Sequence, residues 1–267
     1  YTLSLHDALP ISYSASNSIL SVVSAIVSDD GLSTTHKSDL DGNGTWDQQV
    51  TDETVIGNDG ATTKTISTYD INPAYGTALR SLILATTSDD GRTVSLNEDV
   101  NGDGHWDRQT TVTEADSGIT RTLTSQLSAT GSLQSKSEVV VSANGLSTTT
   151  RNDDDGDSVF DHTKIRQTTL NADGSAAVVV QDQSRSGQLL AKTATIVSDD
   201  GQTVTVTEDF EGDAIDDRTT VTTHVLQANG SALVTETVRS VTNALIYDKS
   251  VLTSADRKMV TTTVDTD

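Results

Sequence analysis

Four short segments of this chain carry oxygen-bearing side chains at a spacing that suits a bound calcium ion. The first, residues 39–47, reads Asp-Leu-Asp-Gly-Asn-Gly-Thr-Trp-Asp, with oxygen-bearing side chains at positions 1, 3, 5 and 9 and glycines at positions 4 and 6. A loop with this spacing can fold around Ca²⁺, with the backbone carbonyl of position 7 as a further ligand. We name the four segments loop 1 (residues 39–47), loop 2 (99–107), loop 3 (153–161) and loop 4 (209–217).

The candidate ligands are hard oxygen donors in all four loops, which favours Ca²⁺ over zinc or copper. They are Asp39, Asp41, Asn43, Thr45 (carbonyl) and Asp47 in loop 1; Asp99, Asn101, Asp103, His105 (carbonyl) and Asp107 in loop 2; Asp153, Asp155, Asp157, Val159 (carbonyl) and Asp161 in loop 3; and Asp209, Glu211, Asp213, Ile215 (carbonyl) and Asp217 in loop 4. The alternative is that Asp-Gly and Asn-Gly clusters only form turns.

The loops differ from an EF-hand at position 12, where an EF-hand has a bidentate Glu. That position is occupied by Val50, Thr110, Lys164 and Thr220. Without this ligand we expect weak affinity, about 10⁻⁴–10⁻³ M, as in extracellular calcium-binding modules.

Position 6 also separates the loops, because it is Gly44 and Gly104 in loops 1 and 2 but Ser158 and Ala214 in loops 3 and 4. If this position requires a positive φ, the last two loops bear a cost of about 1–2 kcal/mol. We therefore expect loops 1 and 2 to bind best.

The loops belong to a tandem repeat. Ser28-Asp29-Asp30-Gly31 recurs from Ser88, Ser142 and Ser198, and each loop begins 11 residues after its Ser. The predicted organisation is 13–87 (a partial repeat plus repeat 1), 88–141 (repeat 2), 142–197 (repeat 3), 198–253 (repeat 4) and 254–267 (repeat 5). Because Ser254 predicts a loop Asp at 265, we expect the sequence to end inside a fifth loop.

Each repeat contains two further turns that end in Gly or Asn, as at residues 58–60 and 74–76. A residue that tolerates positive φ at this place suits a three-residue hairpin. Between turns the sequence alternates, as in Thr203-Val204-Thr205-Val206-Thr207, which is typical of strands. We predict an all-β antiparallel repeat array with four strands of 8–12 residues per repeat and all acidic loops along one edge. A β-propeller is the alternative.

Composition excludes several classes of function. Hydrophobic residues make up 33% and aromatics 3% of the chain, which leaves little material for an enzyme core, and the net charge of −22 would repel nucleic acid and anionic membranes. Low hydrophobicity with high charge also suits disorder, but the regular alternation weighs against it. The chain has no Cys, and no apolar run approaches the roughly 20 residues of a membrane span.

Residues 1–12, YTLSLHDALPIS, match nothing else in the chain. They resemble the translation of a common sequencing-adapter oligonucleotide, so we expect a non-native segment and exclude it from fold prediction.

The repeats resemble the tandem Asp/Thr-rich calcium-binding repeats of large RTX-like secreted proteins and adhesins of Gram-negative bacteria. The resemblance implies a structural region, extracellular or at the bacterial cell surface, that is stiffened by Ca²⁺. Its expected partners are calcium ions, neighbouring repeats and an unknown surface ligand. The alternative is a propeller-like adhesin module that binds carbohydrate or protein through calcium-lined loops. We expect no enzymatic activity, because none of the usual catalytic motifs is present.

Overall fold

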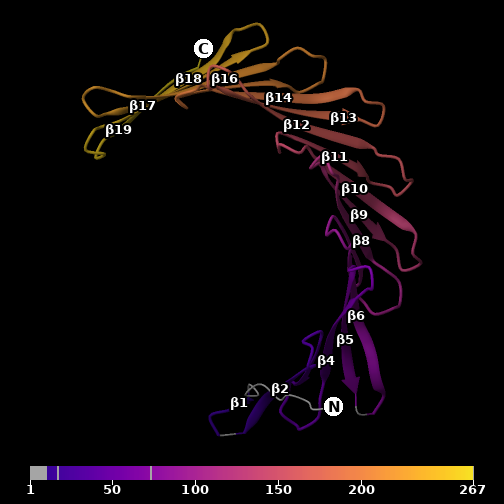
Figure 1. Ribbon diagram of the computed structural model, residues 1–267. Coiled ribbons are helices and arrows are strands. Elements are labelled where there is room, and N and C mark those ends of the chain that lie inside the picture. Colours follow the sequence, from indigo (N-terminus) through magenta and orange to yellow (C-terminus); the bar gives the residue numbers. More distant parts are fainter. Residues whose placement is uncertain (1–10, 17, 73, 267) are drawn as a thin grey trace. The chain divides into compact units, whose positions relative to one another are not determined.

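The computed structural model describes residues 11–16, 18–72 and 74–266, and these residues form β-strands joined by turns, with no helix among them (Figure 1). The chain divides into two compact units, Tyr1–Ser137 with Asp154–Ser158, and Glu138–Asp153 with Val159–Asp267. The boundary falls within β10 (Leu133–Val141).

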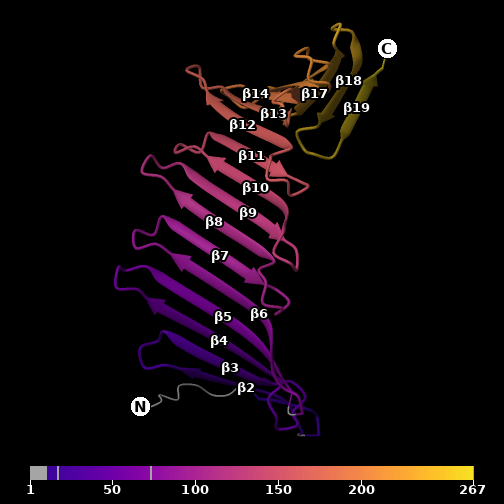
Figure 2. The same ribbon diagram turned by 90° about the vertical axis from the view of Figure 1, so that its right-hand side faces the viewer.

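In the first unit each strand from β1 to β8 pairs antiparallel with the next strand in sequence, which places β2 to β9 side by side in chain order (Figure 2). The strands are β1 (Ile11–Tyr13), β2 (Ile19–Val27), β3 (Ser33–Asp39), β4 (Gln48–Ile56), β5 (Thr62–Asn72), β6 (Gly76–Thr87), β7 (Thr93–Asp99), β8 (Arg108–Glu114) and β9 (Thr120–Leu127).

The second unit repeats this meander from β11 to β19. Its strands are β11 (Ser147–Asp153), β12 (His162–Leu170), β13 (Ala176–Ser184), β14 (Leu189–Val197), β15 (Thr203–Asp209), β16 (Arg218–Leu226), β17 (Ala232–Ser240), β18 (Leu245–Thr253) and β19 (Val260–Asp265).

The predicted all-β antiparallel repeat array is confirmed, and the propeller alternative is wrong. A propeller separates its sheet into four-stranded blades, whereas β6, the last strand of repeat 1, pairs directly with β7, the first strand of repeat 2. The strand that precedes each loop has seven residues, one fewer than the predicted minimum. β8, which follows loop 2, also has seven residues.

The three-residue hairpins are confirmed at seven of the eight predicted turns. The prediction is wrong at 74–76, because Gly76 already belongs to β6 and pairs with Asn72. At residues 58–60, the Gly57 amide donates to the Ala61 carbonyl at 2.7 Å and Gly60 has φ +92°. The Ser-Asp-Asp-Gly turn instead has four residues, since Ser28 and Ser33 pair across it. The Ser28 hydroxyl explains the extra residue, because it bonds Asp30 at 2.6 Å and accepts from the Ser33 amide at 2.8 Å.

The sheet of each unit has no hydrophobic interior. Among the described residues, Val238 is the only buried hydrophobic side chain, while the largest fully buried ones are Asp99, Asp153 and Asp209. A single layer of strands leaves its side chains half-exposed on both faces. The first residue of each acidic loop is therefore the best-buried place in its repeat.

Of the predicted non-native segment 1–12, residues 1–10 lie outside the described residues. Ile11 and Ser12 belong to β1 and pair with β2, with Ile11 opposite Val22. In the described part of the chain, no helix is long and apolar enough to span a membrane.

Candidate metal centre

Loop 1 joins β3 to β4 and wraps its backbone around the carboxylate of its first residue. Asp39 is 3% exposed and accepts hydrogen bonds from the amides of Gly42 at 2.7 Å and Gly44 at 2.8 Å. Burial raises the pKa of Asp39, but the amides of Gly44 and Gly42 outweigh burial and hold that pKa below its ordinary value. The loop therefore keeps a buried, charged carboxylate at its centre.

The remaining acceptors of loop 1 hold the turn in the same way. The Asn43 amide donates to Asp41 at 3.1 Å, and the Thr45 amide donates to the Asn43 side-chain oxygen at 2.7 Å. Asp47 reaches back to the start of the loop and accepts from the Leu40 amide at 2.7 Å. Because a carboxylate oxygen has two lone pairs, one amide bond leaves capacity for a cation.

The structure brings three carboxylates together in two loops. One oxygen from each of Asp39, Asp41 and Asp47 lies within 4.8 Å of the others, and Asp153, Asp155 and Asp161 form the same grouping. This fits a metal ion, since three like charges at this separation repel one another unless a cation lies among them.

Loop 2 repeats the backbone cage with an amide in place of one carboxylate. Asp99, 1% exposed, accepts from Gly102 at 2.6 Å and Gly104 at 2.9 Å, and Asp107 accepts from the Val100 amide at 2.8 Å. Burial raises the pKa of Asp99, but hydrogen bonds from the amides of Gly104 and Gly102 act in the opposite direction, and the pKa stays below its ordinary value. Position 3 is Asn101, so its donor is a neutral oxygen.

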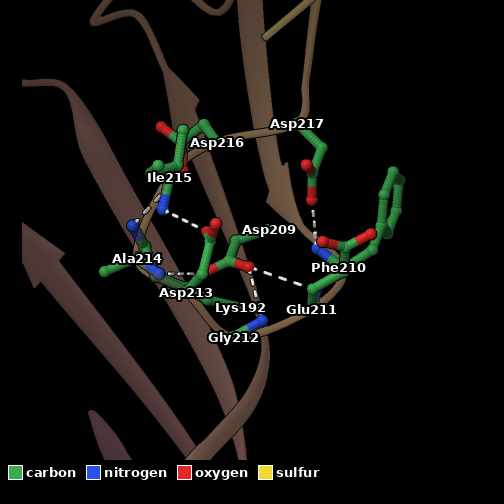
Figure 3. Close-up of polar contacts among 10 residues, drawn as sticks. All are labelled: Lys192, Asp209, Phe210, Glu211, Gly212, Asp213, Ala214, Ile215, Asp216 and Asp217. Carbon is green, nitrogen blue, oxygen red and sulfur yellow. Dashed lines mark hydrogen bonds and ion pairs between the residues drawn. The ribbon is translucent and has the colours of Figure 1, made fainter.

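Loop 4 has the same cage around Asp209 (Figure 3), which accepts from Gly212 at 2.6 Å and Ala214 at 2.9 Å. Asp217 accepts from the Phe210 amide at 2.7 Å. Within the described residues, however, the grouping of three carboxylates occurs only in loops 1 and 3. The expectation that loops 1 and 2 bind best stays a prediction.

The position 7 residues Thr45, His105 and Ile215 each donate an amide to the side chain at position 5. This contact turns the backbone at position 7 but does not place its carbonyl on a cation. Ligation by the carbonyls of Thr45, His105, Val159 and Ile215 stays a prediction.

Position 6 does require a positive φ, as the sequence suggested. Gly44 and Gly104 have φ of +86° and +85°, and Ser158 and Ala214 keep the same conformation at +72° and +69°. Loops 3 and 4 therefore carry the strain expected of a non-glycine residue in the left-handed region.

Position 4 must be glycine because the backbone of a neighbouring strand lies against it, a contact that the sequence did not reveal. A β-carbon on Gly42 would lie 2.2 Å from the Ile19 carbonyl oxygen, and one on Gly212 would lie 2.2 Å from that of Leu189. At both places the next residue, Leu20 or Leu190, is skipped in the pairing with the preceding strand, which marks a β-bulge. Loop 2 has the same bulge at Arg80, so loops 1, 2 and 4 each rest on a bulge, and the recurring glycine was the only signal in the sequence.

Position 8 is Trp46 in loop 1 and Trp106 in loop 2. Trp46 and Trp106 are half-buried, and Trp46 lines a small pocket with Val22, Asp39 and Gly44. In loop 4 this position is Asp216, which instead lies 3.4 Å from the ammonium of Lys192.

An ion pair that sequence reasoning missed closes two of the loops. Glu98 and Arg108 face each other across the hairpin, with Nη2 of the guanidinium 2.7 Å from the carboxylate. Glu208 and Arg218 repeat this arrangement at 2.6 Å. The signal was available, since each Glu directly precedes a loop and each Arg directly follows it.

The arrangement can bind a hard cation through clustered oxygens. No model of a known protein family matches this chain, and no curated protein matches it with statistical significance.

Proposed function

We propose that this chain is the structural calcium-binding repeat region of a large secreted or cell-surface bacterial protein, ordered by Ca²⁺ outside the cell. The observation that carries the proposal is the burial of a caged carboxylate in a sheet that lacks a hydrophobic interior. Asp39 is 3% exposed and gathers Asp41 and Asp47 within 4.8 Å.

The donor set supports calcium. All side-chain donors at positions 1, 3, 5 and 9 are carboxylates or amides, the hard oxygens that Ca²⁺ takes. The backbone cage orients these groups at the edge of the sheet, and the protein's own amides keep the buried carboxylate charged. A bound ion supplies positive charge that relieves repulsion within the loop and in a chain of net charge −22.

The mechanism is linkage between binding and folding. An ion that binds only the ordered loop stabilises it by RT ln(1 + [Ca²⁺]/Kd), about 1.4 kcal/mol per site at ten times Kd. With a Kd of about 10⁻⁴–10⁻³ M, the loops are empty at cytosolic calcium and filled outside the cell. The array is then loose during export and stiff at the cell surface.

Calcium titration of the full chain tests this proposal. The only two tryptophans, Trp46 and Trp106, lie in loops 1 and 2, so their fluorescence reports these loops directly. We expect a saturable change with calcium, a rise in melting temperature and reversal by a chelator. Absence of any change up to about 10 mM calcium, ten times the highest Kd expected here, would contradict the proposal.

A matched pair of variants separates binding from charge. Asp41 and Asp59 each accept the backbone amide two residues ahead, both at 3.1 Å, and both are exposed. Asp41 also accepts from the side-chain amide of Asn43 at 2.9 Å. Asp41→Asn removes a carboxylate from loop 1, whereas Asp59→Asn makes the same change in a plain turn. Only Asp41→Asn is expected to weaken the calcium response of Trp46, and equal effects would point to bulk charge instead.

A further inference from the structure

One repeat position divides the four loops into two classes. The residue 17 places before the first loop Asp is Val22 for loop 1, Leu82 for loop 2, Lys136 for loop 3 and Lys192 for loop 4. Val22, Leu82 and Lys192 are each paired directly opposite the caged Asp of their loop. This position is apolar beside the first two loops and cationic beside the last two.

Both lysines reach their loops. The Lys136 ammonium donates to the carbonyl oxygen of Ser158 at 3.1 Å, in the strained position 6 of loop 3. The Lys192 ammonium lies 3.4 Å from Asp216, at position 8 of loop 4, and Figure 3 shows its side chain behind Asp209 and Asp213. Each lysine therefore ties a loop to the strand on which it rests.

Two positions change together between loop 1 and loop 4. In loop 1, Val22 and Trp46 line one apolar pocket against Asp39, and in loop 4 Lys192 and Asp216 form an ion pair at the same two repeat positions. Lys192 is also less exposed than the cations of eight other ion pairs, at 28% against 44–60%. Low exposure strengthens such a contact, because water screens it less.

Loops 1 and 2 have no equivalent. In the part of the chain that the structure describes, no Lys or Arg forms an ion pair with a carboxylate of these two loops. Loop 3, in contrast, has a second cation, since Arg185 lies 3.6 Å from Asp161.

We propose that Lys136 and Lys192 are calcium-independent braces, which hold loops 3 and 4 in shape without an ion and weaken their affinity for calcium. The chain then combines two loops that respond to calcium with two that its own lysines hold in place. This inference rests on the proposed function, since it concerns how the same sites differ in affinity. An ammonium beside the loop repels an incoming cation and neutralises carboxylate charge that would otherwise attract it.

The test follows loops 1, 2 and 4 separately by NMR of the full chain. The amides of Gly42, Gly102 and Gly212 each donate to the caged Asp of their own loop, so their resonances follow calcium at loops 1, 2 and 4. Lys192→Leu gives loop 4 the residue of loop 2 and leaves Asp216 without this cation. We expect the midpoint at Gly212 to fall about tenfold, which is the effect that one nearby charge has on carboxylate ionisation.

Lys249→Leu is the matched control. Lys249 is exposed on β18 and pairs with Val264 of β19, so it does not lie opposite the first Asp of a loop. It makes the same change in charge and should leave all three midpoints in place. Leu82→Lys is the reciprocal variant, expected to weaken binding at Gly102 about tenfold and to leave Gly42 unchanged. If one variant fails to fold, the other still decides the question.

The outcomes separate the two proposals. Calcium binding at Gly42 and Gly102 with an unmoved midpoint at Gly212 in Lys192→Leu overturns the brace and leaves the proposed function intact. No response at any of the three glycines up to about 10 mM calcium, well above the Kd range of extracellular modules, overturns both.

Discussion

A β-carbon on Gly102 would lie 2.2 Å from the carbonyl oxygen of Leu79, at the bulge on which loop 2 rests. No side chain fits at that distance, so the loop or the strand must move. Gly102 has φ +73° and Gly104, two residues later, has φ +85°, but a β-carbon on Gly104 would meet nothing within 4 Å. The two glycines of one loop therefore have different reasons to be glycine.

We predict that Gly102→Ala destabilises the chain far more than Gly104→Ala. The first substitution adds a backbone clash to the conformational strain, whereas the second adds strain alone, about 1–2 kcal/mol. Ala214 already occupies the equivalent of Gly104 in loop 4, which shows that the second change can be accommodated. Urea unfolding measures both, and equal losses would contradict the role assigned to the bulge.

Strain at position 6 gives the opposite prediction for loop 4. Ala214 has φ +69°, so Ala214→Gly should raise the free energy of unfolding by about 1 kcal/mol, less the entropy that glycine adds to the unfolded chain. Asn243 has φ +62° in a hairpin, and Asn243→Gly should gain less, because Asn tolerates this conformation better than Ala. A larger gain at Asn243 than at Ala214 would refute this ranking.

The repeat frame made most of the fold predictable from sequence. The recurring Ser, the loop Asp and the turn glycines fix four hairpin ends per repeat, and alternation between them indicates strands. The sequence left the propeller alternative open, because periodicity within a repeat does not show whether its last strand pairs with the first strand of the next repeat. The pairing of β6 with β7 decides this.

The sequence predicted which segments form the candidate sites, but not the burial of the first Asp in each loop or the lysine beside loop 4. Spacing located Asp39 and its equivalents, yet no pattern showed that the carboxyl group of this residue would be nearly inaccessible to water. The backbone amides of Gly42 and Gly44 surround this carboxylate, and no pattern in the sequence indicates such a fold of the loop. Lys192 was overlooked because it lies 17 residues from Asp209, and only strand register brings the two together.

The Ser-Asp-Asp-Gly turns predict a dependence of stability on pH that is separate from the loops. Hydrogen bonds from the Ser198 hydroxyl and then from the Gln202 amide hold the pKa of Asp200 below its ordinary value, although burial acts in the other direction. A lowered pKa in the folded state means that the stabilisation is complete above the unfolded pKa of about 3.9. It is lost as pH falls through the folded pKa.

Asp200→Asn tests this dependence without breaking the turn. Asn144 fills the same position in repeat 3 and accepts from Ser142 at 2.8 Å, so the variant should keep its geometry. We expect the stability difference between wild type and variant to be constant above about pH 5 and to shrink below about pH 4, near the ordinary pKa of Asp. Urea unfolding at a series of pH values measures it, and a difference that grows on acidification would show the opposite sign.

The ion pair at the neck of loop 2 gives the last prediction. Arg108 contacts Glu98 through two nitrogens, and Glu98 is only 12% exposed while Arg108 is 47% exposed. We expect Arg108→Gln to cost about 1 kcal/mol, the upper end for a partly solvated pair, and the cost to shrink in high salt. Arg80→Gln is the control, since Arg80 and Asp70 are both 56% exposed and 3.4 Å apart, and it should change stability little. If the two substitutions cost the same, the position of Glu98 beneath the loop does not strengthen the pair.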